Sequence, residues 1–220
     1  MNILICGDVV GRTGREIIEK KLPYIISKEE IDFVIVNGEN SAGGFGINKK
    51  ICENFYSLGV DVITTGNHVW DQKDILDTLN NDPRILRPNN YSKNCPGKGV
   101  GIFQTSEGSK IIVINIMCRL FMENIDDPFL VLDQTLKQVE NVVDPIIIVD
   151  VHGEATSEKM AIGHFLDGRV SAVVGTHTHV PTSDLHIMKK GTFYQSDLGM
   201  CGDYDSVVGM NKEISILKFT

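Results

Sequence analysis

The sequence predicts an α/β fold, because short apolar runs rich in β-branched residues alternate with longer amphipathic stretches. The apolar runs have the length and composition of strands that are buried on both faces of a sheet. The chain has 220 residues, which fits one domain with a substantial core. We therefore expect a single α/β domain that spans residues 1–220.

The first third of the chain repeats the order strand, loop, helix. Strands are expected at residues 2–6, 32–37 and 60–65. Amphipathic helices are expected at residues 14–30 and 47–58. Pro23 should bend the first helix, and Asp71 should cap a third helix after the last of these strands. Trp70, the only tryptophan, is interpreted as a core residue.

The remaining elements follow with one weaker region. Residues 84–94 are rich in Pro and Asn and are expected to form a loop. Strands are expected at residues 100–105, 110–117, 145–151 and 170–174. A helix should begin within residues 124–128 and end near Val143, and another should follow Thr156.

Charge, cysteine content and the N-terminus exclude several classes of protein. The net charge of -8 argues against general binding to nucleic acid or to anionic membranes, which requires clustered Lys and Arg. The five cysteines are odd in number and lack the C-x-x-C spacing, which favours a reducing cytoplasm over a disulfide framework. The N-terminus has no basic segment followed by a long apolar one, so we expect neither a signal peptide nor a membrane span. A cytoplasmic protein is therefore expected.

Polar side chains able to bind metal stand at or just beyond the ends of the apolar strands, where open α/β sheets bind ligands. These residues are Asp8, Glu39, Asn67, His68, His152, His177 and His179. In extended backbone the spacing of His177 and His179 would direct both rings to the same side. Two ions that share one carboxylate would use about this many ligands, and the mixed set suits Fe, Mn or Zn better than Ca or Mg. His164 and His186 lack this placement and are expected to be structural or solvated.

Two other interpretations fit parts of the pattern. Gly7, Gly11 and Gly14 with Glu39 resemble a dinucleotide-binding fingerprint, but Asp8 would repel a pyrophosphate, whereas it would bind a cation. The histidines at strand ends could also simply be bound to water. The number of strand ends with a candidate ligand favours metal over both.

Several motifs together resemble the bacterial YmdB-like branch of the calcineurin-like metallophosphoesterase superfamily. They are Gly7-Asp8-Val9-Val10-Gly11-Arg12, Asn37-Gly38-Glu39-Asn40, Thr65-Gly66-Asn67-His68-Val69-Trp70-Asp71, His152-Gly153-Glu154-Ala155-Thr156-Ser157-Glu158-Lys159, Gly175-Thr176-His177-Thr178-His179 and Gly199-Met200-Cys201-Gly202. The resemblance covers nearly the whole chain. It implies a four-layer αββα sandwich, in which two mixed sheets are flanked by helices, and phosphodiesterase activity on cyclic nucleotides.

The resemblance also implies roles for individual residues. The wider superfamily has a histidine two residues after the first Asp, where this chain has Val10, and the resemblance implies that Asn40 fills the vacancy. It implies one ion bound by Asp8, Glu39, Asn40 and His179. It implies a second ion bound by Glu39, Asn67, His152 and His177. His68 would then be an acid near the leaving group.

These expectations describe a binuclear metal-dependent phosphodiesterase that hydrolyses small phosphodiesters, with 2′,3′-cyclic or 3′,5′-cyclic AMP as the substrate type. The expected cofactors are two transition-metal ions, iron first and then manganese or zinc. With two divalent ions, Asp8, Glu39 and a bridging hydroxide leave about one positive charge, which matches a phosphodiester monoanion better than a monoester dianion. A trivalent ion or help from Arg12 would erase that preference. A nucleotide-responsive regulator with slow hydrolysis and a metal-dependent protein phosphatase remain alternatives.

Two features depart from the YmdB-like pattern. Asp203 replaces the usual Pro after the Cys-Gly pair, and the chain ends at Lys218-Phe219-Thr220, earlier than expected for this branch. We expect a homo-oligomer, and the early end leaves open whether a last strand, or an oligomer contact made by it, is formed.

Overall fold

The computed structural model describes residues 1–220, and its elements alternate along most of the chain. The strands are β1 (Ile3–Cys6), β2 (Asp8–Val9), β3 (Phe33–Asn37), β4 (Val62–Thr64), β5 (Ile85–Leu86), β6 (Val100–Gln104), β7 (Lys110–Met117), β8 (Ile146–His152), β9 (Ala172–Thr176), β10 (His186–Ile187), β11 (Phe193–Gln195) and β12 (Met200–Cys201). The helices are α1 (Gly11–Lys28), α2 (Lys49–Ser57), the 3-10 turn η1 (Asn67–Trp70), α3 (Ile75–Asn81), α4 (Pro128–Gln138), α5 (Thr156–Leu166) and α6 (Lys212–Phe219).

Two sheets form the framework, and their strand orders show the α/β class. The first sheet has the order β1-β3-β4-β5 and is wholly parallel. The second has the order β10-β11-β9-β8-β7-β6, with parallel central strands and an antiparallel strand at each edge. The expectation of two mixed sheets was therefore wrong for the first sheet, because each connection between its strands passes through a helix or helical turn that returns the chain in the same direction.

The side chains of β3 show why this strand reads as a continuous apolar run. Phe33 and Ile35 belong to a buried cluster that also contains Val113 and Ile148 of the second sheet. The alternate residues of β3 pack with α1 and α2 in another cluster. Successive side chains of a strand point to opposite faces, so both faces of β3 are buried.

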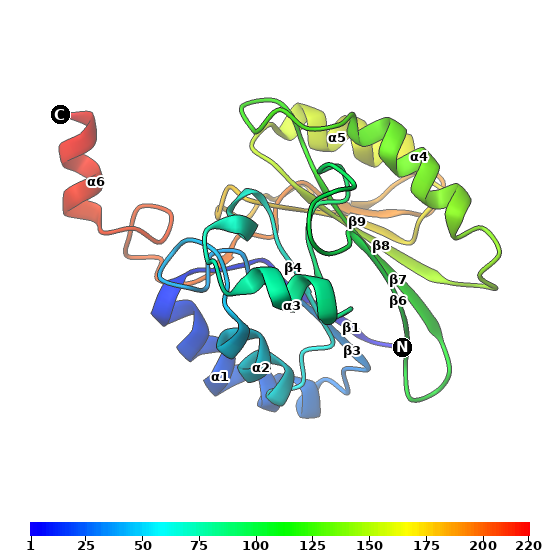
Figure 1. Cartoon of the computed structure of the whole chain (residues 1–220), viewed down its shortest axis with the longest axis horizontal. Coiled ribbons are helices and arrows are strands. Elements are labelled where there is room, and N and C mark those ends of the chain that lie inside the picture. The colour runs from blue at the N-terminus through cyan, green and yellow to red at the C-terminus, as the bar shows by residue number, and fades with distance from the viewer.

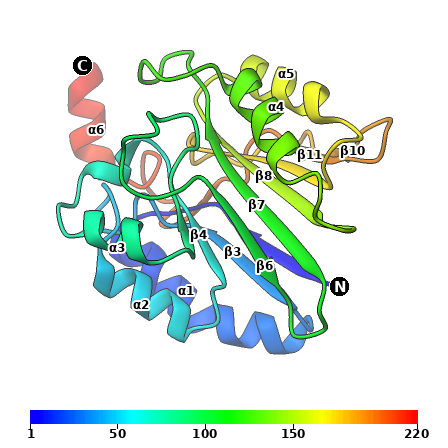
Figure 2. The ribbon, with the colours of Figure 1, turned by 45° about the vertical axis from the view of Figure 1, so that its right-hand side comes forward.

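Four helices, α1, α2, α4 and α5, lie on the outer faces of the two sheets. Helices α1 and α2 lie on one side of the molecule, whereas α4 and α5 lie on the other side (Figures 1 and 2). Leu132 of α4 and Ile162 of α5 pack against the second sheet in a third apolar cluster. Helix α6 projects away from both sheets and has no buried residue (Figure 1). None of the helices is both long enough and apolar enough to cross a membrane.

Several boundaries differ from the sequence-based expectation. Helix α1 begins at Gly11 and contains Pro23, and α4 ends at Gln138 instead of near Val143. The region expected to be only a loop contains β5, which pairs with β4 through Ile85 and Leu86. This short strand escaped prediction because its apolar run is only a few residues long.

Asp71 does not cap the following helix, so that expectation was wrong. Helix α3 is preceded by Asp74, whose side chain makes no capping hydrogen bond. The chain forms the turn η1 first, and Asp71 lies at the end of that turn. Trp70 packs at the margin of the core with its ring edge-on to Tyr91, which agrees with its interpretation as a core residue. His164 and His186 are exposed, as expected.

Candidate metal centre

The eight predicted site residues converge at the carboxyl ends of the parallel strands. Asp8 lies in β2, His152 is the last residue of β8, and Glu39 and Asn40 follow β3. The other four follow β4 or β9 and are Asn67, His68, His177 and His179. Parallel strands bring these positions to one edge, although they are distant in sequence.

Glu39 and two histidines form the tightest group. The Nε2 atom of His152 lies 2.9 Å from Oε1 of Glu39. The same Nε2 atom lies 3.1 Å from Oδ1 of Asn67 and 3.1 Å from Nδ1 of His177. Candidate ligand atoms of Glu39, His152 and His177 all lie within 4.8 Å of one another, so these three residues could hold a metal ion.

A second group of candidate ligands approaches the same Oε1 atom of Glu39. Nδ2 of Asn40 is 3.3 Å from Oε1 of Glu39 and 2.8 Å from Nε2 of His179. The same Nε2 atom is 3.8 Å from Oδ1 of Asp8. Oδ1 of Asp8 is fully buried and has no hydrogen-bond partner. A buried carboxylate oxygen without a partner is costly, and a cation at this position would remove that cost.

The backbone around His177 and His179 differs from the extended form that we expected. Both residues have positive φ, 105° and 66° respectively. Two carboxylates hold the backbone of this loop. The His177 N–H donates to Oδ2 of Asp8 at 3.0 Å, and the Thr178 N–H donates to Oδ2 of Asp197 at 3.0 Å. Nδ1 of His179 lies 2.7 Å from the carbonyl oxygen of Val208, which leaves Nε2 facing the cluster.

Burial and mutual charge shift the pKa values of the clustered groups. Burial raises the pKa of Asp8 to about 6, although His152 opposes the rise. Burial would also raise the pKa of Glu39, but the ion pair with His152 outweighs it and lowers that pKa to about 2. Burial and then the charge of His152 lower the pKa of His177 to about 3, so its imidazole is neutral at pH 7. An ionised carboxylate beside a neutral imidazole is a donor set that suits a transition metal.

Comparison with known proteins agrees with the motifs and their arrangement. The model of the family described as "YmdB-like protein" matches residues 4–220. The chain belongs to the YmdB-like family. A 2′,3′-cyclic-nucleotide 2′-phosphodiesterase of Bacillus subtilis (strain 168) is 45% identical over 219 residues, which cover 100% of this chain and 82% of the relative.

Two solved structures have the same fold as this YmdB-like chain. A hypothetical protein from Thermus thermophilus has a TM-score of 0.93 and 42% identity, and the match covers 100% of this chain and 84% of that one. A structure named as a novel phosphatase of Mycoplasma pneumoniae has a TM-score of 0.88 and 39% identity, with 98% and 78% of the two chains covered.

His68 of this YmdB-like protein lies beside the cluster and differs from the other histidines. Its backbone N–H donates to Oε2 of Glu39 at 3.1 Å, while Nδ1 of its ring lies 2.8 Å from Oδ2 of Asp71. The carboxylate can only accept, so it favours a proton on Nδ1 and leaves Nε2 available. Asp71 therefore orients the His68 ring. The sequence did not predict this role, because an Asp shortly before a helix is expected to cap that helix.

Helix α5 holds the segment that follows β7 and the end of β9, contacts that the sequence did not predict. The carboxylate of Glu158 accepts the backbone N–H groups of Arg119 and Leu120 at 2.9–3.1 Å. Nζ of the buried Lys159 lies 2.9 Å from Oδ2 of Asp197 and 2.8 Å from the carbonyl oxygen of Thr176. Glu158 and Lys159 stand in a motif that carried the family resemblance, but no local pattern indicates what they contact.

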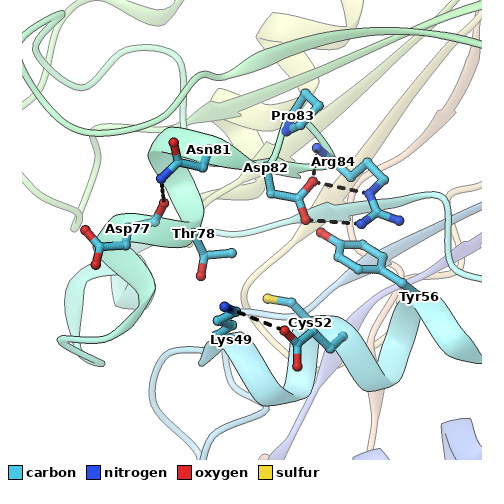
Figure 3. Close-up of a pocket in the computed structure, with 10 residues that line it drawn as sticks. Lys49, Cys52, Tyr56, Asp77, Thr78, Asn81, Asp82, Pro83 and Arg84 are labelled. Carbon is cyan, nitrogen blue, oxygen red and sulfur yellow. Dashed lines mark hydrogen bonds and ion pairs between the residues drawn. The ribbon is translucent and has the colours of Figure 1, made fainter.

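A cavity of about 480 Å³ lies between α2 and α3, away from these site residues (Figure 3). Four of its charged side chains form two pairs: Arg84 lies 3.2 Å from Asp82, and Lys49 lies 3.8 Å from Glu53. The Arg84 guanidinium also stacks 3.6 Å from the centre of the Tyr56 ring. None of the predicted site residues lines this cavity, and we assign it no part in the reaction.

Proposed function

We propose that this YmdB-like protein is a binuclear metal-dependent phosphodiesterase that hydrolyses small phosphodiesters, with cyclic nucleotides as the substrate class. The observation that carries the proposal is the presence of two groups of candidate ligands that share Glu39. One comprises Asp8, Glu39, Asn40 and His179, and the other comprises Glu39, Asn67, His152 and His177. The name of the Bacillus subtilis relative supports the choice of a cyclic nucleotide.

The proposed site belongs to one catalytic domain of residues 1–220 with a four-layer αββα order. Two bound transition-metal ions, with iron favoured over manganese or zinc, would stabilise charge on the phosphoryl oxygens and activate a water. The chain itself contributes the donor atoms, their burial and one proton donor. The imidazolium form of His68, with both ring nitrogens protonated, can deliver the Nε2 proton to the departing ribose oxygen, while Asp71 holds the proton on Nδ1.

Protein purified without chelators is expected to contain about two transition-metal ions per chain, as two-metal sites require. Elemental analysis should measure this content before and after chelation. A substrate panel of 2′,3′-cyclic and 3′,5′-cyclic nucleotides, linear diesters and a phosphoprotein should then show the highest kcat/KM on a cyclic nucleotide. Hydrolysis by metal-free protein would refute the metal-dependent mechanism, and a preference for the phosphoprotein would favour a protein phosphatase.

Phe45 is a candidate contact for the nucleobase. Its ring is exposed and lies edge-on to His68, with 4.9 Å between ring centroids. The surrounding turn is held by a 2.9 Å bond from the Ala42 N–H to the Gly46 carbonyl and by a 2.8 Å bond from Gln72 to the Phe45 carbonyl. A fixed aromatic surface beside the proton donor can stack on a base.

Phe45→Ala is expected to raise KM for a cyclic nucleotide by about tenfold, since stacking of a base is worth about 1–3 kcal/mol. The KM for glycerol 1,2-cyclic phosphate, which has no base, should stay at the wild-type value. Steady-state kinetics on both substrates make the measurement, and Phe219→Ala, at an exposed position of α6, is the matched control. Equal changes on the two substrates would show that Phe45 only supports His68.

A further inference from the structure

Asp150 places a carboxylate in the layer between the two sheets. It alternates along β8 with Ile148 and His152, so these three side chains share one face of the strand. Ile148 belongs to the apolar cluster between the sheets, and Asp150 is only 2% exposed. Burial of a carboxylate there carries a desolvation cost that an apolar residue would avoid.

Hydrogen bonds from both sheets converge on this carboxylate. The Thr64 hydroxyl donates to Oδ2 of Asp150 at 2.5 Å, and the Asn37 amide donates to the same oxygen at 3.4 Å. The Thr176 hydroxyl donates to Oδ1 at 2.7 Å. Burial raises the pKa of Asp150, and the bonds from Thr64 and Thr176 oppose that rise because they favour the carboxylate.

Thr176 connects Asp150 to His152. Its Oγ1 atom lies 2.9 Å from Nδ1 of His152, and the two residues are neighbours in the ladder between β8 and β9. A hydroxyl has a single proton, and Thr176 gives it to Asp150. Oγ1 must therefore accept the proton of Nδ1, which leaves Nε2 of His152 free to face Glu39 and Asn67.

We propose that Asp150 is a positioning residue of the metal centre, acting through the Thr176 hydroxyl to fix the tautomer and ring orientation of His152. The proposal rests on the proposed function, because it takes His152 as a metal ligand. A histidine whose second nitrogen is held in this way is a more basic and better oriented ligand. Asp150 touches neither metal nor substrate, so its effect passes through the one imidazole that it orients.

Thr64 provides a matched control because it makes the same kind of bond to Asp150 without contacting His152. The Thr64 bond joins Asp150 to the first sheet, whereas the Thr176 bond joins neighbouring strands of the second sheet. If the carboxylate only fastened the two sheets together, Thr64→Val would disturb the metal centre at least as much as Thr176→Val. If it positions His152, only the Thr176 variant should alter metal binding. Thr176→Ser keeps the hydroxyl and should rescue it.

The test measures the affinity of both sites for Mn²⁺ and Zn²⁺ by chelator competition on the purified full chain, with circular dichroism to verify folding. Thr176→Val should lower the affinity for one ion by about 10–100-fold and leave the affinity for the other unchanged. A loss of this size is typical when a residue that hydrogen-bonds to a metal ligand is removed. Asp150→Asn, the second variant, should weaken the same ion. Thr176→Ser and Thr64→Val should bind both ions with wild-type affinity, although Thr64→Val should melt at a lower temperature.

Wild-type affinity for both ions in folded Thr176→Val or Asp150→Asn would overturn this proposal alone. An equal loss in Thr64→Val would also overturn it, because it would assign the effect to the fastening of the sheets. A wild-type protein that binds neither ion would instead overturn the proposed function, and this proposal with it.

Discussion

Glu39→Gln is expected to remove both metal ions and with them nearly all hydrolysis. Oε1 of Glu39 lies 2.9 Å from Nε2 of His152 in one group and 3.3 Å from Nδ2 of Asn40 in the other. The substitution keeps the shape of the side chain and removes a charge that both proposed sites share. The loss of metal affinity should exceed the loss of about 10–100-fold that is typical when a residue that only hydrogen-bonds to a metal ligand is removed.

Asp8→Asn is the comparison that makes this result informative. The side chain of Asp8 lies near the ring of His179. Its one hydrogen bond to the group that contains His152 and Asn67 comes from the backbone N–H of His177. It should therefore mainly weaken one ion. Elemental analysis and kcat on a cyclic nucleotide measure both variants, with Glu53→Gln on the exposed face of α2 as a control. Minor and equal losses from Glu39→Gln and Asp8→Asn would show that the shared ligand is a different residue.

His68→Ala is expected to lower kcat on a cyclic nucleotide by about 10²–10⁴-fold while both ions remain bound, since this is the usual contribution of a general acid. The ring of His68 pairs with Asp71 and does not enter either group of candidate ligands. A ribose hydroxyl is a poor leaving group that needs the proton. p-Nitrophenolate leaves without one, so a p-nitrophenyl diester should be hydrolysed almost as fast as by the wild type.

The histidines of the proposed metal sites should behave differently. His152→Ala and His177→Ala should lose metal and both activities together, whereas His164→Ala, at an exposed position of α5, should lose neither. Steady-state kinetics on the two substrates, with metal content measured on the same samples, separates these outcomes. Equal losses of His68→Ala on both substrates, with full metal content, would exclude the acid role.

The convergence of the candidate residues could be predicted from sequence because buried parallel strands read as apolar runs, and the polar residue that ends each run marks the edge of the sheet. Asp8, Glu39, Asn67 and His152 were chosen as candidate ligands in this way. The backbone conformation of the residues that follow β9 could not be predicted from sequence. Its regular His-x-His spacing suggested extended backbone, whereas hydrogen bonds from distant residues hold His177 and His179 at positive φ.

The supporting residues escaped prediction because their partners are remote in the chain. Asp150 lies 86 residues from Thr64 and 113 residues from Asn37. In sequence it is a single acid inside an apolar strand, and nothing local indicates which face of the sheet it occupies or what it contacts. Asp71 was expected to cap the helix that follows it. Instead, the η1 turn brings the His68 ring within hydrogen-bond distance of the Asp71 carboxylate before that helix begins.

The contacts of α5 link the local unfolding of this helix to that of two other segments. Glu158 holds the backbone at Arg119 and Leu120, and the next residue, Lys159, holds Thr176 at the end of β9 and Asp197. Both contacts come from one turn of one helix. Local opening of a protein proceeds in contiguous cooperative units. The segments at Arg119–Leu120 and at Asp197 therefore belong to the same unit as α5, and fraying of this helix would release both segments in one event.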